Sequence, residues 1–246
     1  NPRGWSVKEL SEDDVSLFRL SRTNFDISPV YVHSSYLINM AAKDNTLRRK
    51  SIDLLTLEMG RADAIGADFV ILHTGSASGN DQHTATKRAI DALNEVARRG
   101  DWKAGLLVEN TAGERGDICS SIEELSEITN LVKGRLISGI CVDTCHAFAA
   151  GYNICSNEII KEISSKIEHY MGRDKTKLIH LNDSKGEVGS RIDRHEHIGF
   201  GKIGIKGLST FINYHSFRNI PIILETPKKR PFDDPMNLNK VREMIF

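Results

Sequence analysis

The stretch ADFVILHTGSASGNDQHTATKRAIDALNEVARRG, residues 67–100, contains one complete unit of the pattern that decides the fold. It begins with the apolar run ADFVILH (67–73), which predicts a buried strand. From Thr84 onward apolar residues recur every three or four positions, and the segment ends in Gly100, as helices often do. The stretch therefore predicts a strand followed by a helix.

The same pattern recurs along the chain, with amphipathic segments such as TLRRKSIDLLTLEMGRADAIG (46–66) between the apolar runs. The predicted strands are ISPVYVH (27–33), ADFVILH (67–73), AGLLVEN (104–110), ISGICVD (137–143), KLIHLND (177–183) and IPIILET (220–226). Such a repeat is typical of parallel strands covered by helices, in a doubly wound sheet or an eight-stranded barrel. No Gly-rich phosphate loop follows a strand, which weakens the dinucleotide-binding version of the doubly wound fold.

Composition narrows the class of protein. At 246 residues, 39% hydrophobic and 27% charged, the chain suits one α/β domain, and we expect residues 1–246 to form it. No apolar run approaches a membrane span and no secretory leader is present, so we expect a soluble intracellular protein without membrane partners. The four cysteines lack CxxC spacing, which predicts no disulfides and, for Cys141 and Cys145, small buried side chains.

Charge alone does not indicate a nucleic-acid partner, because 33 basic residues balance 33 acidic ones. A local basic patch would suffice for DNA binding, and two groups of residues are candidates. They are KKR at 228–230, and the set Lys185, Arg191, Arg194 and Lys202. Each of these residues is also compatible with an ordinary solvated surface.

Residues that can bind metal ions stand at the end of every predicted strand. They are His33, His73, Glu109, Asp143, His180 and Glu225. A single such residue is commonly a packed histidine or a helix cap, but capping does not account for six of six. In a barrel the carboxyl ends of all strands lie on one face, so the six residues are expected to converge.

Imidazoles mixed with carboxylates suit zinc or another first-row divalent ion better than calcium or magnesium. A catalytic zinc takes about three protein ligands, so the set implies more than one ion. Glu109 is placed to bridge two ions, as in sites that activate water for phosphoryl displacement.

Seven motifs, in order and spanning most of the chain, resemble those of the endonuclease IV family of apurinic/apyrimidinic endonucleases. They are HSSYLIN (33–39), LHTGS (72–76), VENTAG (108–113), VDTCHAFAAGY (142–152), HLNDSK (180–185), GSRIDRHEHIGFGKIG (189–204) and ILETP (223–227). The resemblance implies a TIM (β/α)8 barrel and a zinc-dependent deoxyribonuclease IV. Such an enzyme hydrolyses the phosphodiester on the 5′ side of an abasic site and leaves a 3′-hydroxyl.

The resemblance also implies the roles of individual residues. Three zinc ions per chain are expected: one held by His33, His73 and Glu109, a second by Glu109, Asp143, His180 and Glu225, and a third by His146, Asp193 and His195. Glu109 and a bridging hydroxide would place the nucleophile. Arg3, in NPRGW (1–5), and Tyr36 and Leu37 are expected to insert into the duplex; without the resemblance, Tyr36 and Leu37 are ordinary helix-start residues.

The implied partner is double-stranded DNA with abasic sites or blocked 3′ ends, bound by a monomer. The implied location is cytoplasmic for a bacterial or archaeal protein, and nuclear or mitochondrial for a eukaryotic one.

Thr74 departs from the family, since many members have proline there. Members also have two βα strands before the NPRGW segment, so we expect this chain to lack the first two strands of the barrel.

Two alternatives stay open. A divalent-metal sugar isomerase or epimerase on a related barrel also gathers histidines and carboxylates at strand ends, but it has no use for the third ligand set. A non-catalytic DNA-binding fragment would follow from the missing strands.

Within GSRIDRHEHIGFGKIG, the glycines are expected to act as hinges for a loop over the metal face, and His197 has no assigned role.

Overall fold

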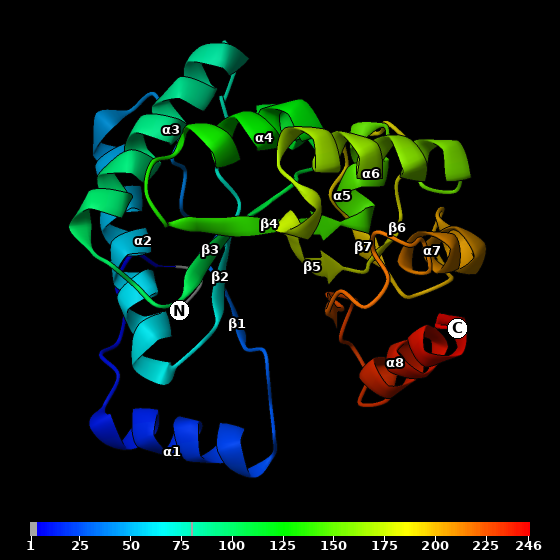
Figure 1. Ribbon diagram of the computed structural model, residues 1–246, viewed down its shortest axis with the longest axis horizontal. Helices are drawn as coiled ribbons and strands as arrows, with labels where there is room; N and C mark the ends of the chain where they lie inside the picture. The colour runs from blue at the N-terminus through cyan, green and yellow to red at the C-terminus, as the bar shows by residue number, and fades with distance from the viewer. Residues whose placement is uncertain (1–3, 80) are drawn as a thin grey trace. The chain divides into compact units, whose positions relative to one another are not determined.

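A computed structural model describes residues 4–79 and 81–246 (Figure 1). Two compact units make up the chain. The first unit contains Asn1–Val108 and Ile128–Gly139, and the second contains Glu109–Glu127 and Ile140–Phe246. Arg3, predicted to contact DNA, lies outside the described residues. The single domain over residues 1–246 stays a prediction.

The first unit alternates helices and parallel strands, as its sequence pattern predicts. Its elements are α1 (Glu12–Asn24), β1 (Tyr31–His33), α2 (Asn45–Ile65), β2 (Phe69–Leu72), α3 (Gln82–Arg99), β3 (Gly105–Glu109, the last residue in the second unit) and the start of β4 (Ile137–Asp143). β2 lies between β1 and β3 and is parallel to both, with Phe69 opposite Tyr31 and Gly105. The βα pattern of residues 67–100 is thereby confirmed.

Local sequence signals set the ends of these helices. Asp44 and Asp81 cap α2 and α3, because each side chain accepts the backbone N–H of the residue three positions on. α2 ends at Gly66, whose left-handed φ of 73° suits a glycine. α3 buries the stripe Ala85, Ala89, Leu93 and Val96, which lies on one face of the helix.

The second unit contains β4 from Ile140 onward and the elements that follow it. They are α5 (Thr144–Ala150), α6 (Asn157–Tyr170), β5 (Thr176–His180), β6 (Asp183–Ser184), β7 (His195–Glu196), α7 (Gly204–Ile212), β8 (Ile222–Ile223) and α8 (Asp233–Met244), with 3-10 turns at Glu114–Gly116 and Arg173–Lys175. β5 lies between β4 and β8 and is parallel to both. β6 and β7 form a separate antiparallel pair. The helix α4 (Ile122–Leu131) crosses the boundary between the units.

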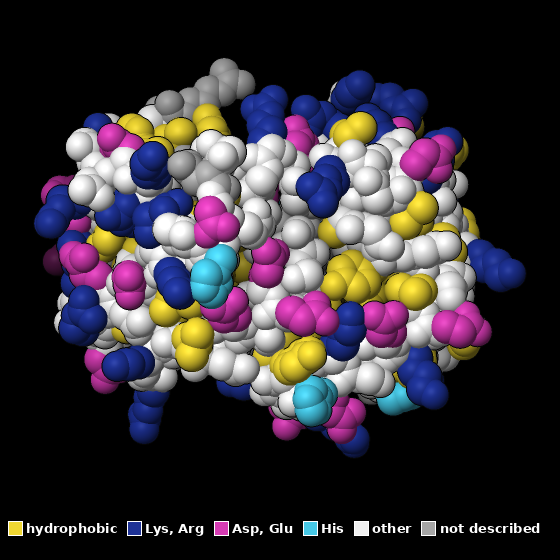
Figure 2. Space-filling view, turned by 90° about the horizontal axis from the view of Figure 1, so that it is seen from above, with side chains coloured by type: hydrophobic (Ala, Val, Ile, Leu, Met, Phe, Trp, Pro, Cys, Tyr) yellow, Lys and Arg dark blue, Asp and Glu magenta, His cyan; other side chains and the backbone are white. Residues whose placement is uncertain are grey.

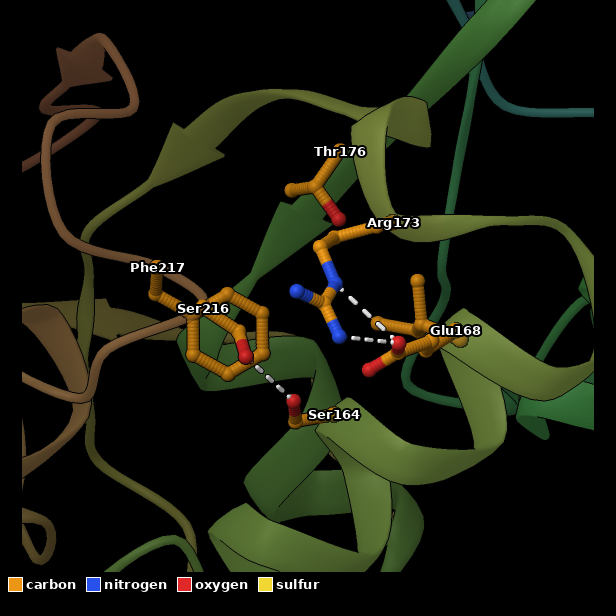
Figure 3. A pocket seen from close by; sticks show the side chains of 7 residues that line it. Ser164, Glu168, Arg173, Thr176, Ser216 and Phe217 are labelled. Atoms are coloured by element: carbon orange, nitrogen blue, oxygen red, sulfur yellow. Dashed lines mark hydrogen bonds and ion pairs between the residues drawn. The ribbon is translucent and has the colours of Figure 1, made fainter.

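Side-chain contacts hold the end of α6 in place. Ser164 on α6 hydrogen-bonds Ser216 with 2.7 Å between the hydroxyl oxygens, and Arg173 pairs with Glu168 (Figure 3). Phe217 is buried beside them and stacks on Phe211 of α7 with ring centroids 4.4 Å apart. The side chains that line this small hollow therefore connect the end of α6 with the region of α7.

All six predicted strands are present, most of them shorter than the apolar runs that predict them. The helix-start interpretation of Tyr36 and Leu37 is wrong, because both lie in a turn and α2 begins only at Asn45, after the capping residue Asp44. Among the described residues, no helix is both long and apolar enough to cross a membrane.

Candidate metal centre

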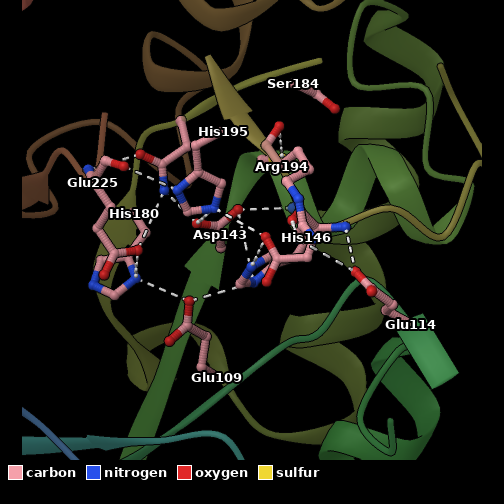
Figure 4. A network of polar contacts seen from close by, with 12 residues as sticks. Glu109, Glu114, Asp143, His146, His180, Ser184, Arg194, His195 and Glu225 are labelled. Carbon is pink, nitrogen blue, oxygen red and sulfur yellow. Dashed lines mark hydrogen bonds and ion pairs between the residues drawn. The ribbon is translucent and has the colours of Figure 1, made fainter. Parts of the chain in front are cut away.

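Seven of the predicted ligands belong to the second unit, on strand ends, on α5 and in the connecting loops, and Figure 4 labels all of them except Asp193. They are Glu109, Asp143, His146, His180, Asp193, His195 and Glu225. Glu109, Asp143 and His180 are the last residues of β3, β4 and β5. Asp143 and His180 are opposite each other in the register of the parallel pair, so both side chains emerge at the same edge.

One group consists of Glu109, Asp143, His180 and Glu225, whose ligand atoms all lie within 4.8 Å of one another. The Nδ1 atom of His180 is 2.9 Å from Glu109 Oε1 and 3.2 Å from Glu225 Oε2. Glu109 and Asp143 are fully buried and His180 is 1% exposed. These four residues are the set that the family resemblance assigns to the second ion.

A second group surrounds Asp193, in the loop between β6 and β7. Asp193 Oδ1 is 3.3 Å from His146 Nε2 and 3.4 Å from His195 Nε2. The other ring nitrogens are held by backbone carbonyls, because His146 Nδ1 is 2.9 Å from Asn110 O and His195 Nδ1 is 3.1 Å from Glu225 O. Each imidazole is thus oriented with Nε2 toward Asp193, as a metal ligand requires.

Asp143 connects the two groups. It ends β4 and caps α5, because its Oδ1 accepts the backbone N–H of His146 at 2.7 Å. Its Oδ2 is 3.8 Å from His195 Nε2. The strand therefore positions one predicted ligand, and the helix that directly follows positions the next.

The carboxylates control the protonation of these histidines. Burial alone would lower the pKa of His146, but Asp143, Asp193 and Glu109 raise the pKa well above its usual value. Burial also opposes the charge on His195, yet Asp193 and Asp143 raise its pKa to about 9. Burial would raise the pKa of Asp193, but the neighbouring imidazoles of His146 and His195 hold that pKa far below its usual range. A metal ion entering this group would displace protons from the imidazoles.

The residues of both groups fit zinc. Histidine nitrogen and carboxylate oxygen are ligands that zinc takes in catalytic sites. His195 Nε2 is buried and makes no hydrogen bond to any described residue, although it faces two carboxylates. A buried nitrogen in that position is what a ligand set needs, and a structural histidine would normally be hydrogen-bonded.

In the first unit His33 and His73 lie together, with ring centroids 5.4 Å apart. His33 is exposed, and its Nδ1 is 2.9 Å from the carbonyl oxygen of Ser34. His33 ends β1, and His73 directly follows β2. Glu109 belongs to the second unit, so the set that joins it to these two histidines stays a prediction.

Cys141 and Cys145 are buried, as predicted; both lie near candidate ligands, and all four cysteines are free. Burial raises the pKa of Cys145 to about 12, and the charge of Asp143 adds to the effect. Burial, followed by the charge of Glu109, also raises the pKa of Cys141 well above its usual value. Both thiols are therefore neutral near pH 7 and act as small packed side chains.

Comparison with known proteins decides the family. The sequence matches the xylose isomerase-like TIM barrel family over residues 2–245. "Probable endonuclease 4" of Halothermothrix orenii is 43% identical over 230 residues, which is 93% of this chain and 82% of that protein. The crystal structure of endonuclease IV from Thermus thermophilus superposes with a TM-score of 0.84 at 34% identity, covering 99% of this chain and 86% of that chain. This chain belongs to the endonuclease IV family.

The predicted family and the predicted α/β fold of TIM-barrel type are thereby confirmed. A D-tagatose 3-epimerase-like protein has a TM-score of 0.72, but its 20% identity shows a common fold only. The isomerase alternative is accordingly less supported than the endonuclease IV assignment.

In this member of the endonuclease IV family, Asn182 supports the candidate site, a role that was not predicted from the sequence. Its side chain is fully buried, and its Nδ2 donates to Asp143 Oδ2 at 2.5 Å and to Glu225 Oε2 at 3.4 Å. Its Oδ1 accepts the backbone N–H of Glu225 at 2.8 Å. Asn182 therefore holds two predicted ligands in place. Its position two residues after His180 in HLNDSK was the available signal, because alternate residues of extended chain share a face.

Most of the candidate basic residues are paired with acids. The pairs are Lys185 with Glu196 at 3.9 Å, Arg194 with Glu114 at 3.9 Å, Lys202 with Glu187 at 2.5 Å, Lys228 with Asp234 at 3.1 Å and Arg230 with Asp233 at 3.0 Å. Figure 2 shows one face of the molecule, on which basic and acidic side chains are interspersed. These pairs fit the interpretation of an ordinary charged surface better than that of a dedicated basic patch.

Proposed function

We propose that this protein is a DNA repair endonuclease that hydrolyses the phosphodiester 5′ to an abasic site and leaves a 3′-hydroxyl. The observation that carries the proposal is the pair of ligand groups in the second unit, which Asp143 connects. Family membership supports the same reaction. A sugar isomerase needs one ligand group, and the second group around Asp193 would have no use in it.

Zinc is the proposed cofactor, with three ions per chain. One ion would be held by His146, Asp193 and His195. A second would be held by Glu109, Asp143, His180 and Glu225, and a third by His33, His73 and Glu109. The chemistry that zinc supplies when bound is polarisation of the phosphate and activation of a water molecule.

The protein's own contribution is to fix the charges around the phosphate. Glu109 Oε1 is 2.9 Å from His180 Nδ1 and 3.4 Å from His146 Nδ1, so this one carboxylate faces histidines of both groups. Because Glu109 is fully buried and its neighbours are hydrogen-bonded, its position needs little reorganisation during the reaction. We assign it the role of placing the nucleophile.

The proposed partner is double-stranded DNA with abasic sites or blocked 3′ ends, bound by a monomer. Tyr36 is 67% exposed and lies with the half-buried Leu37 in a turn after β1, where a side chain is available for insertion beside a missing base. Arg3 is proposed for the same role from the sequence. The proposed location is the cytoplasm of a bacterial or archaeal cell, or the nucleus or mitochondrion of a eukaryotic one.

The decisive experiment combines metal analysis with cleavage of a duplex that carries one abasic site. We expect about three zinc ions per chain, nicking on the 5′ side of the lesion, and loss of nicking in Glu109→Gln. An intact duplex of the same sequence is the control substrate. Nicking by protein shown to contain no metal, or undiminished nicking by Glu109→Gln, would refute the proposal; about one ion per chain without nicking would favour an isomerase.

A further inference from the structure

Asp183 is a fully buried carboxylate outside both ligand groups. It accepts five backbone N–H groups. Its Oδ1 accepts from Ser184 at 2.9 Å, Ile203 at 3.1 Å and Gly204 at 3.2 Å, and its Oδ2 accepts from Gly199 at 2.9 Å and Gly201 at 3.0 Å. Four of the five donors belong to the glycine-rich segment 199–204. One side chain therefore holds four backbone positions of that segment.

At Gly201 the fit between the segment and the carboxylate leaves no space for a side chain. A Cβ atom at Gly201 would lie 2.4 Å from Asp183 Oδ1 and 2.4 Å from Ser184 O, well inside van der Waals contact. At this position the glycine serves close approach rather than the hinge role expected from the sequence. The loop is held against Asp183 and its neighbour Ser184.

The same short stretch also holds a predicted ligand. In the antiparallel pair of β6 and β7, Asp183 is opposite Glu196 and Ser184 is opposite His195. Lys185 donates its backbone N–H to Arg194 O at 2.9 Å, on the residue before His195. On its other side Ser184 O accepts the backbone N–H of Lys202 at 2.7 Å. Residues 183–185 thus lie between the strand that carries His195 and the segment that Asp183 organises.

We propose that Asp183 is a positioning residue for the ion held by His146, Asp193 and His195. The five N–H groups occupy its oxygens, so it acts through the backbone rather than as a ligand. They compensate for the burial of its charge, which makes the arrangement rigid and costly to disturb. Rigidity of 199–204 fixes β7, and with it the imidazole of His195. This inference rests on the proposed function.

Two substitutions test the inference, with zinc content and zinc affinity measured by chelator competition. Asp183→Asn keeps the shape of the side chain but replaces one acceptor oxygen by a donor. Gly201→Ala keeps the carboxylate and displaces its partner. We expect both variants to bind one of the three ions about 10–100-fold more weakly, as is usual for residues that orient ligands, and to retain the other two.

Asp233→Asn is the matched control. Asp233 is also fully buried and accepts the backbone N–H groups of Lys229 at 2.9 Å and Arg230 at 2.8 Å, but it organises a loop without predicted ligands. We expect this variant to lose stability and to keep the zinc affinity of the unmodified protein. The comparison separates loss of a loop contact from loss of a metal-positioning contact.

The inference is overturned if Asp183→Asn and Gly201→Ala unfold more easily than the unmodified protein yet hold all three ions with unchanged affinity. It is equally overturned if Asp233→Asn loses the same ion. If Asp183→Asn does not fold, the result for Gly201→Ala decides. Failure of the proposed function is distinguishable, because the unmodified protein itself would then bind fewer than three ions or leave abasic DNA intact.

Discussion

Replacing Asn182 by alanine removes the contacts that hold two predicted ligands. The lost bonds are Nδ2 to Asp143 Oδ2 at 2.5 Å, Nδ2 to Glu225 Oε2 at 3.4 Å and Glu225 N to Oδ1 at 2.8 Å. A neutral hydrogen bond contributes about 1 kcal/mol to stability and one to a charged group about 1.5–3 kcal/mol. Allowing for the length of the second bond, we expect the free energy of unfolding to fall by about 3–5 kcal/mol.

Urea unfolding of metal-free protein, followed by circular dichroism, measures this loss without a contribution from bound zinc. The control is Asn213→Ala, whose half-buried side chain also makes three hydrogen bonds to backbone groups, and a longer one of 3.4 Å to Ser209 Oγ. Its Nδ2 donates to Ser209 O at 2.9 Å and Met244 O at 2.7 Å, and its Oδ1 accepts from Phe246 N at 3.2 Å. Both variants should be destabilised, but only Asn182→Ala should also bind zinc about 10–100-fold more weakly. A loss in Asn182→Ala below about 1 kcal/mol, or unchanged zinc affinity, would refute the reasoning.

Three further predictions follow from packing and exposure. Gly60→Ala, at an exposed position of α2 with no atom within 4 Å of the added Cβ, should raise the free energy of unfolding by about 1 kcal/mol; an unchanged urea midpoint would contradict this. Leu93→Ala, in the fully buried stripe of α3, should lower that free energy by about 2–5 kcal/mol, and a loss below about 1 kcal/mol would show that the stripe packs loosely. Cys155 is the exposed thiol and Cys145 is buried with a pKa raised to about 12, so a thiol reagent at pH 8 should modify native protein at Cys155 first, as peptide mass mapping would reveal. Equal labelling of Cys145 in folded protein would be inconsistent with the structure.

The sequence predicted the strand-end positions of the candidate ligands well, because two local signals coincide at each of them. Apolar runs locate the strands, and a polar residue that closes such a run must lie at the strand's carboxyl end. His33, Glu109, Asp143 and His180 are the last residues of their strands, as expected. His73 and Glu225 lie just beyond strand ends, where backbone pairing has already stopped.

The hydrogen bonds that support the candidate ligands could not be predicted from the sequence in this way. Four of the donors to Asp183 lie 16 to 21 positions further along the chain, and nothing in its immediate neighbourhood indicates those partners. His197 had no assigned role, yet its Nδ1 is 3.0 Å from Asn237 Nδ2, and the buried Asn237 also accepts the N–H of Ile198. That contact ties the loop after β7 to α8. Such roles depend on tertiary hydrogen bonds, which residue patterns do not encode.

The direct passage from β4 into α5 limits which changes in chain length the protein tolerates. Asp143 ends the strand and Thr144 begins the helix, so no connecting residue separates them. One inserted residue would turn the helix by about 100° and carry His146 away from Asp193. The connection between β6 and β7 includes the exposed residues Glu187 and Val188, where extra length would leave the paired strands intact. Insertions and deletions among relatives should therefore accumulate in that connection and be absent from the junction at Asp143.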